Sequence, residues 1–283
     1  MRVSVLDDLS RRGAKNGPDL PDNIQFHRAD ICDAAVLREA MDGADLVYHL
    51  AAISSVGAAQ DDFGSAYRVN VIGTETVLKV AQACGVRRIV FSSSREVYGE
   101  PLDLPVLESA PLRPKSAYGL TKASGESCCR VADSVDAVVL RLANVYGPGD
   151  FGRVIPIFLR NALLGEPLLL FGGEQILDFI WFEDVVDALI AAGGSQAVAG
   201  PLNIGSGVGM QITEVARKIV ALAGSSSPVR LLPKRDFEVM RFVADTSAAK
   251  RSLVLNANSD PLAHLGELME WTRHQLRTSG AID

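Results

Sequence analysis

The sequence predicts an α/β protein, in which helices cover both faces of a doubly wound parallel sheet, with a smaller second domain. In the first half, short apolar runs such as "RVSVLD" (2–7) and "VRRIVFSSS" (86–94) alternate with helical patterns. Such alternation is typical of βαβ units, whose strands are buried on both faces. Beyond about residue 150 the alternation loosens, so we expect domains over residues 1–150 and 151–283.

The elements follow from the same patterns. Strands are predicted at residues 2–7, 24–30, 44–52, 86–94 and 135–147, and helices at 33–43, 66–85 and 116–133. Gly85 is expected to end the helix at 66–85, because glycine readily adopts the left-handed conformation that follows a helix. In the second part we expect helices at 153–165, 182–193, 212–224 and 262–277, and a short strand at 167–172.

The composition restricts the function classes. The 283 residues carry a net charge of −6, whereas a nucleic-acid surface needs clustered Lys and Arg, so no nucleic-acid partner is expected. The apolar runs are short and interrupted, which predicts no membrane span. The cysteines form no C-x-x-C pair and the histidines show no zinc spacing, so we expect reduced thiols, no metal and a cytoplasmic protein.

Three polar side chains are expected to meet at one edge of the sheet. Ser94 ends the strand at 86–94, and Tyr118 and Lys122 lie four residues apart at a helix start, hence on one face. Ligands bind at the carboxyl ends of strands in such sheets. A nearby ammonium lowers the pKa of a phenol, which is otherwise near 10. Tyr118 is therefore a candidate base for a substrate hydroxyl, with Ser94 holding the oxygen.

These residues stand in a series of motifs that resembles the extended short-chain dehydrogenase/reductase family, the UDP-galactose 4-epimerase-like nucleotide-sugar epimerases and dehydratases. The motifs are "SSSREVYG", "YGLTK", "RLANVYGPG", "WFEDVVDAL", "LNIGSG" and "RFVADTSAAKR", in the family's order. The resemblance runs from residue 1 to nearly the C-terminus. It implies a Rossmann-like domain that binds NAD and a smaller domain that binds a nucleotide sugar.

The resemblance also implies roles for individual residues. Lys122 would hold the nicotinamide ribose as well as assist Tyr118. The cofactor would further contact Asp7, Leu9, Asp30, Ile31, Leu50, Ala51, Ala52 and Asn70. The sugar nucleotide would contact Ser94, Asn144 and Arg235. In this scheme the adenine lies between Asp30 and Ile31, and Asn70 supports the loop beneath the cofactor.

Four of these residues have local alternatives. Asp7 at a strand end suits two ribose hydroxyls and repels a 2′-phosphate, which favours NAD over NADP, but it is equally a turn acid. Asp30 is either a cofactor ligand or the cap of the helix that follows. Arg235 is either a phosphate ligand or a solvated surface charge. Asn144 either binds the substrate or stabilises a turn through its hydrogen bonds.

The first departure from the family lies at the N-terminal end. The family begins with a strand and a G-x-x-G-x-x-G turn whose backbone N–H groups hold the pyrophosphate. This sequence starts at what resembles the second strand, so the turn is absent as a block. Loss of a central strand predicts that the sheet is parted, with unpaired backbone groups beside the gap. We expect a gene start further upstream, flanking strands that close up directly, or another copy that fills the gap.

The second departure follows Ser94. Arg95 and Glu96 stand where epimerases of the family often carry small residues. Dehydratases and decarboxylases often carry Glu at the position of Glu96, where it removes a proton beside the new ketone, but the dehydratase acid one place earlier is Arg95 here. Glu96 is therefore either catalytic or a surface acid paired with Arg95. In addition, Leu177 stands where many relatives place an Arg for the substrate phosphates.

Together these observations predict an NAD-dependent nucleotide-sugar 4-epimerase that acts through a transient 4-keto sugar. A nucleotide-sugar 4,6-dehydratase or decarboxylase that uses Glu96 is the alternative enzyme. A shortened, non-catalytic remnant or binding protein is the alternative from another class. The resemblance also implies a homodimer through helices near residues 66–84 and 118–132. The sugar and the nucleotide stay open.

Overall fold

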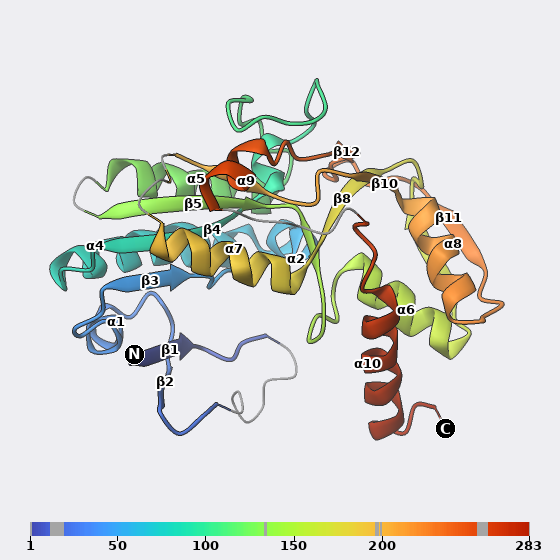
Figure 1. Ribbon diagram of the computed structural model, residues 1–283, viewed down its shortest axis with the longest axis horizontal. Coiled ribbons are helices and arrows are strands. Elements are labelled where there is room, and N and C mark those ends of the chain that lie inside the picture. The colour runs from blue at the N-terminus through green and yellow to red at the C-terminus, as the bar shows by residue number, and fades with distance from the viewer. Residues whose placement is uncertain are drawn as a thin grey trace. The chain divides into compact units, whose positions relative to one another are not determined.

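The chain forms two compact units, each of them built from two segments. The computed structural model (Figure 1) describes residues 2–11, 20–132, 135–195, 198, 200–253 and 260–282. The first unit comprises Met1–Ser93 and Ala117–Leu140, and the second comprises Ser94–Ser116 and Arg141–Asp283. The chain passes from one unit to the other after Ser93, Ser116 and Leu140. The expected assignment of cofactor and substrate binding to residues 1–150 and 151–283 stays a prediction.

The first unit is an α/β assembly of parallel strands and helices (Figure 1). Its elements are β1 (Val3–Asp7), β2 (Ile24–Arg28), α1 (Ala34–Ala40), β3 (Leu46–His49), α2 (Val56–Asp61), α3 (Phe63–Tyr67), the π-helical segment η1 (Arg68–Gly73), α4 (Thr74–Ala83), β4 (Arg88–Ser94), α5 (Ala117–Val131) and β5 (Asp136–Leu142). Strands β4 and β5 reach into the second unit with their last residues. The predicted α/β class is confirmed.

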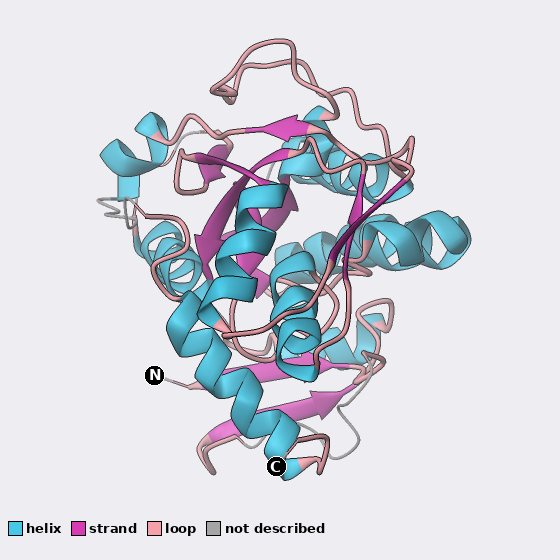
Figure 2. Ribbon diagram, turned by 90° about the vertical axis from the view of Figure 1, so that its right-hand side faces the viewer, coloured by secondary structure: helices cyan, strands magenta, loops and turns pink. Residues whose placement is uncertain are grey.

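The parallel strands of this unit belong to separate sheets. Strands β1 and β2 pair with each other near the N-terminus (Figure 2), whereas β3, β4 and β5 are successive strands of a four-stranded sheet that ends with β9 (Leu202–Ile204). Among the described residues, no ladder joins β1 or β2 to β3. The prediction that the sheet is parted is confirmed. Direct closure of the flanking strands is wrong, because in the part of the chain that the structure describes β1 pairs with β2, β3 pairs with β4, and the two pairs are not joined.

Strand β4 lies at the centre of the first unit's core. All seven of its residues are buried, as expected for a strand that is covered on both faces. Helix α4 packs Val77, Leu78 and Ala81 into the same core, which is one face of a helix at this spacing. Burial of Val77 and of Leu78 each stabilises the fold by about 1.5–3 kcal/mol. This core fixes the carboxyl end of β4, where Ser93 and Ser94 lie.

The second unit contains short sheets and five α-helices among the residues that the structure describes. Its elements are the 3₁₀ turn η2 (Arg95–Tyr98), β6 (Asn144–Tyr146), α6 (Val154–Leu164), β7 (Leu168–Phe171), β8 (Ile176–Trp181), α7 (Phe182–Gly194), β9, β10 (Gly209–Gln211), α8 (Ile212–Leu222), β11 (Val229–Leu232), β12 (Arg241–Phe242), α9 (Ser247–Leu253) and α10 (Leu265–Thr278). Strand β8 pairs with β6, β10 and β12, and β7 pairs with β11. A shared apolar core joins α6, α8 and α10.

Two predicted elements are corrected. The single strand expected at 135–147 is two strands, because the chain leaves one sheet after β5 and pairs β6 with β8 in another. The single helix expected at 66–85 is interrupted by η1, whose widened turn follows α3 and precedes α4. Both differences arise from packing partners distant in sequence, which a local pattern does not contain.

Candidate active site

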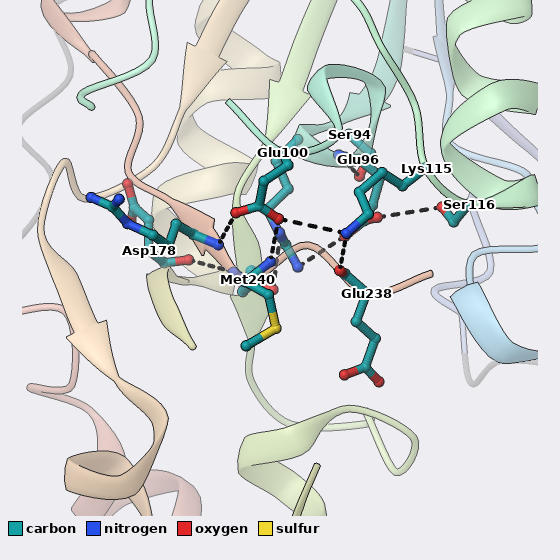
Figure 3. Close-up of polar contacts among 11 residues, drawn as sticks. Ser94, Glu96, Glu100, Lys115, Ser116, Asp178, Glu238 and Met240 are labelled. Carbon is teal, nitrogen blue, oxygen red and sulfur yellow. Dashed lines mark hydrogen bonds and ion pairs between the residues drawn. The ribbon is translucent and has the colours of Figure 1, made fainter. Parts of the chain in front are cut away.

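The carboxyl end of β4 presents Ser94. Ser94 is the last residue of the strand, and its side chain caps η2, with Oγ accepting a hydrogen bond from the Glu96 backbone N at 3.2 Å (Figure 3). The residue is only 8% exposed. The sequence therefore placed this serine correctly at a strand end. Its role toward a substrate stays a prediction.

Glu96 is buried and both of its carboxylate oxygens are bound. Arg95 Nη2 lies 2.9 Å from Glu96 Oε1, and Ser116 Oγ donates to Oε2 at 3.3 Å (Figure 3). The Glu96 side chain is only 6% exposed. The predicted pairing with Arg95 is therefore confirmed, and a catalytic role of Glu96 stays a prediction. The expected surface location is wrong, because η2 turns the pair into the interior of the second unit.

Asn144 connects Arg95 to the strands of the second unit. Its Oδ1 accepts from Arg95 Nε at 3.2 Å, and its Nδ2 donates to the backbone oxygen of Asp178 at 2.9 Å. These bonds tie β6 to β8 and hold the guanidinium beside Glu96. The structural alternative for Asn144 is thus supported, although it is a strand and not a turn that is tied. Contact with the sugar nucleotide stays a prediction.

Arg235 lies on an exposed segment before β12. Its guanidinium stacks on the Phe171 ring, 3.5 Å from the centroid, and pairs with Glu238 at 3.2 Å. The segment is anchored by Glu100, which accepts from the Met240 and Arg241 backbone N at 2.8 and 3.1 Å (Figure 3). The stacked guanidinium is held in place, as phosphate recognition requires. That role stays a prediction.

Helix α5 positions Tyr118 and Lys122 in the first unit. Both are buried, at 8% and 2% exposure. Lys122 Nζ lies 4.4 Å from the centroid of Phe91, and within the described ranges it has neither a hydrogen-bond acceptor nor an ion-pair partner. Burial lowers the pKa of Lys122 to about 8. An ammonium has three N–H donors, so this one is suited to hold acceptor groups of a ligand.

A buried polar network supports the start of α5. Asn70, in η1, accepts from the Ile53 backbone N at 2.8 Å and donates to the Ile53 oxygen at 3.1 Å. It also donates to Thr121 Oγ1 at 2.9 Å, and that hydroxyl donates to the Tyr118 backbone oxygen. The supporting role expected of Asn70 therefore has a structural basis in the loop after β3. A π-helical turn at such a position is common at functional sites.

The network continues to His49, which the sequence analysis did not select. The Thr74 hydroxyl donates to the Asn70 backbone oxygen at 2.7 Å, so it accepts from His49 Nε2 at 2.8 Å. This assigns the Nε2–H tautomer to His49. Burial, together with the nearby Lys122, lowers the pKa of His49 to about 3. His49 is therefore neutral and structural, and no sequence motif marked it.

The residues predicted for the adenosine side lie after β1 and β2. Asp7 ends β1 and its Oδ1 accepts from the Leu9 N at 2.7 Å, while Leu9 adopts a φ of 56°. Asp30 pairs with Arg68 at 2.5 Å and accepts from the Cys32 N. The helix-cap alternative for Asp30 is wrong, because Asp33 caps α1.

The remaining predicted cofactor residues differ in exposure. Ile31 is buried in the core. A Cβ added to Gly73 would lie 2.5 Å from Cδ1 of Ile31, so the Ile31 side chain packs against η1. Leu50, Ala51 and Ala52 follow the end of β3, and Leu50 is 52% exposed. Of the three, Ala51 and Ala52 are small, and the close approach of the cofactor to this segment stays a prediction.

The structure thus places the predicted residues in two groups. Asp7, Leu9, Asp30, Ile31, Leu50, Ala51, Ala52, Asn70, Tyr118 and Lys122 belong to the first unit, and Ser94, Glu96, Asn144 and Arg235 to the second. The convergence of Ser94 with Tyr118 stays a prediction. Among the described residues, no cluster of three His, Cys, Asp or Glu side chains could hold a metal, and no helix has the length and apolar character of a membrane span.

The parallel α/β unit with a Tyr–Lys pair on one helix defines a class of NAD-dependent enzymes that act on hydroxyl groups. The chain belongs to the NAD dependent epimerase/dehydratase family, whose model matches residues 1–205. It is therefore an enzyme of the nucleotide-sugar epimerase/dehydratase class with NAD as its cofactor.

Three relatives represent different reactions of this family. The chain is 34% identical to a UDP-glucose 4-epimerase of Mycolicibacterium smegmatis, over 89% of this chain and 84% of the relative. It is 29% identical to a UDP-N-acetyl-alpha-D-glucosaminuronate decarboxylase of Bacillus cytotoxicus, over 96% and 90%. The structure resembles DesIV, a dTDP-glucose 4,6-dehydratase of Streptomyces venezuelae with NAD bound, with a TM-score of 0.91, 28% identity, and 98% and 89% coverage.

The residues of the first unit fit NAD at both of its ends. Lys122 offers a buried ammonium without an acceptor among the described residues, which suits the nicotinamide ribose. Asp7 offers an exposed carboxylate at a strand end, with Oδ1 alone engaged by a hydrogen bond within the described chain, which suits the other ribose. The G-x-x-G-x-x-G turn is not part of the sequence. The donor set therefore matches the two riboses.

Proposed function

We propose that the chain is a nucleotide-sugar 4-epimerase. Tyr118 and Lys122 supply the acid–base pair, and the second unit binds the nucleotide sugar through Ser94, Asn144 and Arg235. When bound, NAD⁺ supplies the acceptor and later the donor of the hydride at the sugar carbon. Because both hydride steps occur in one catalytic cycle, the reaction causes no net redox change.

The proton chemistry follows from the environment of Tyr118. Its helix carries Lys122 one turn further on, and an ammonium beside a phenol favours the phenolate. Tyr118 would take the proton of the sugar 4-hydroxyl and return it after the sugar has turned over. Ser94 would bind the same oxygen and keep it oriented. Burial of Tyr118 and Lys122 would limit exchange of this proton with water before Tyr118 returns it.

One observation favours epimerisation over elimination or decarboxylation: the Glu96 carboxylate is held by Arg95 and Ser116. In the elimination, a carboxylate at this position acts as the base that removes a proton beside the ketone, whereas decarboxylation releases CO₂ from that carbon and needs a group that returns a proton to it. A buried carboxylate in an ion pair must give up that pair before it can act as a base, and breaking such a pair costs about 3–5 kcal/mol. Epimerisation does not require Glu96 to act as a base.

The test is a product analysis. The purified protein is incubated with UDP-glucose, UDP-galactose and GDP-mannose, and the products are identified by NMR. We expect interconversion of two 4-epimers without accumulation of NADH, and we expect Tyr118→Phe to lose this activity while it still binds NAD⁺ in calorimetry. Loss of water or of CO₂ would instead assign the reaction to the Glu96-dependent alternatives. Full activity of Tyr118→Phe would contradict its role as the base.

We also propose that the enzyme is a homodimer. The helices near residues 66–84 and 118–132 carry large apolar side chains that are exposed in the first unit, namely Tyr67 at 44%, Ile72 at 44% and Leu120 at 48%. These helices pack against one another through η1 and α5, so their exposed side chains belong to neighbouring elements. Exposed apolar groups on adjacent helices are typical of an interface between subunits.

A further inference from the structure

A buried carboxylate in the first unit has no role in the proton chemistry described above. Glu126 lies on α5, one turn after Lys122, and is only 8% exposed. Its Oε1 accepts a hydrogen bond of 2.5 Å from Ser93 Oγ, at the buried end of β4. A buried carboxylate is costly unless it is paired, so its presence here calls for a physical reason.

The spacing of α5 puts Glu126 and Lys122 on the same face. Residues four apart on a helix are neighbours, and opposite charges at this spacing attract each other. Ser93 holds the Glu126 carboxylate from the strand side, while Phe91 of the same strand lies under the Lys122 ammonium at 4.4 Å. Lys122 and Glu126 of α5 therefore both face strand β4. In the low dielectric of a protein interior their attraction is much stronger than at the surface.

We propose that Glu126 is a positioning residue that keeps Lys122 in its ammonium form. Ser93 fixes the carboxylate, the carboxylate stabilises the charge on Lys122, and the charged Lys122 is the form that can hold a ribose and favour the Tyr118 phenolate. The consequence for turnover rests on the proposed function, whereas the effect on Lys122 itself does not.

The other groups around Lys122 do not supply this charge. The titratable and aromatic side chains that interact with it are Glu126 and Cys129 from α5, His49 from β3 and Phe91 from β4, and Tyr118 lies one turn earlier on α5. Burial raises the pKa of Cys129 to about 12, so the thiol is uncharged wherever Lys122 titrates. His49 is neutral as well. Burial lowers the pKa of Lys122, whereas Cys129 and Glu126 act in the opposite direction, and of these two Glu126 is the one that carries a carboxylate.

The experiment measures the titration of Lys122 directly. Protein labelled with ¹³C at the lysine ε-carbons is titrated by NMR without cofactor or substrate, and the Lys122 signal is assigned from its absence in Lys122→Arg. In Glu126→Gln, which keeps an acceptor for Ser93 but loses the charge, the midpoint is expected to move to lower pH by about one pH unit. Glu126→Met serves as a second uncharged variant in case the buried amide impairs folding.

Two controls separate charge from packing. Ser93→Ala removes the hydrogen bond that fixes the carboxylate but keeps the carboxylate itself, so its midpoint should move clearly less than in Glu126→Gln. Glu75→Gln removes an exposed acid on α4 that pairs with Lys79, and should have no effect. An unchanged midpoint in both uncharged Glu126 variants, or an equal movement in Ser93→Ala, would overturn the inference. A moved midpoint in a protein without epimerase activity would refute the proposed function alone.

Discussion

The buried positive charge of Lys122 lowers the stability of the fold, but the proposed catalysis requires it. Its ammonium is buried at 2% exposure, and burial lowers its pKa from 10.5 to about 8. Below pH 8 the group is charged in both the folded and the unfolded chain, and the fold bears the cost of burying that charge. The proposed catalysis needs the same charged form. The residue is therefore retained at the expense of stability, as is common at functional sites.

Replacement of this lysine by methionine gives a prediction with a definite sign. Between pH 8 and about 10.4 the unfolded chain binds the proton that the folded chain has released, so this group makes the free energy of unfolding rise with pH. Lys122→Met should be more stable than the wild type at pH 7, by up to about 3 kcal/mol. The advantage should shrink above pH 8. Urea unfolding of both proteins at pH 7, 8.5 and 10 measures it, and a constant difference would contradict the argument.

At the level of residues, motif spacing predicted the positions of Ser94, Tyr118 and Lys122 on a strand end and a helix. It missed Glu126, although its spacing from Lys122 was a usable signal, because glutamate on a helix is usually solvated. It also missed His49, which lies in a strand and enters the network through Thr74. Such partners meet through tertiary packing, so a local pattern does not contain them.

At the level of elements, helix α5 depends on a close approach to strand β4. A Cβ added to Gly125 would lie 2.8 Å from Phe91 Cζ, and Phe91 is fully buried, so its ring has no free space to move into. A side chain at this position would separate the helix from the strand. Since Lys122 and Glu126 flank Gly125 on α5, the approach also determines where both charges lie.

This approach predicts opposite effects for two glycine substitutions. Gly125→Ala should destabilise the protein by about 1–3 kcal/mol through overpacking. Gly266→Ala, in helix α10, meets no atom within 4 Å and should stabilise it by about 0.5–1 kcal/mol, because alanine is the better helix former. Denaturant unfolding of both variants provides the comparison. Equal stability of Gly125→Ala and the wild type would contradict this argument, because it would show that the Phe91 ring can move to accommodate the added methyl group.

The sequence predicted most helices and strands, but it did not predict where the chain passes from one sheet to another. The alternation of short apolar runs with helical patterns predicted β2, α1, β3 and β4. Each of these elements is a single apolar or helical pattern in the sequence, and turn residues separate it from the next element. The run at 135–147 is equally apolar on both sides of Ala143, so it read as one strand. The division between β5 and β6 depends on the pairing of β6 with β8, about 35 residues later.

At the level of the whole molecule, the proposed homodimer gives a further prediction. Ile72→Asp, on the exposed side of η1, should convert a dimer to a monomer in sedimentation experiments, because an interface does not accept an unpaired buried charge. Ile190→Asp is a matched control, since Ile190 is 61% exposed on α7 of the second unit and outside the proposed interface. Dimerisation of both variants would place the interface elsewhere. A monomeric wild type would refute the proposal.

The alternation of segments between the two units restricts how the gene can be divided. Because the chain changes unit after Ser93, Ser116 and Leu140, no continuous stretch of codons encodes either unit by itself. A fragment that stops at residue 150 would carry residues 94–116 and 141–150 without the remainder of their unit. Exchange of substrate specificity between relatives by recombination would therefore require several coordinated crossovers, whereas point substitutions can accumulate one at a time.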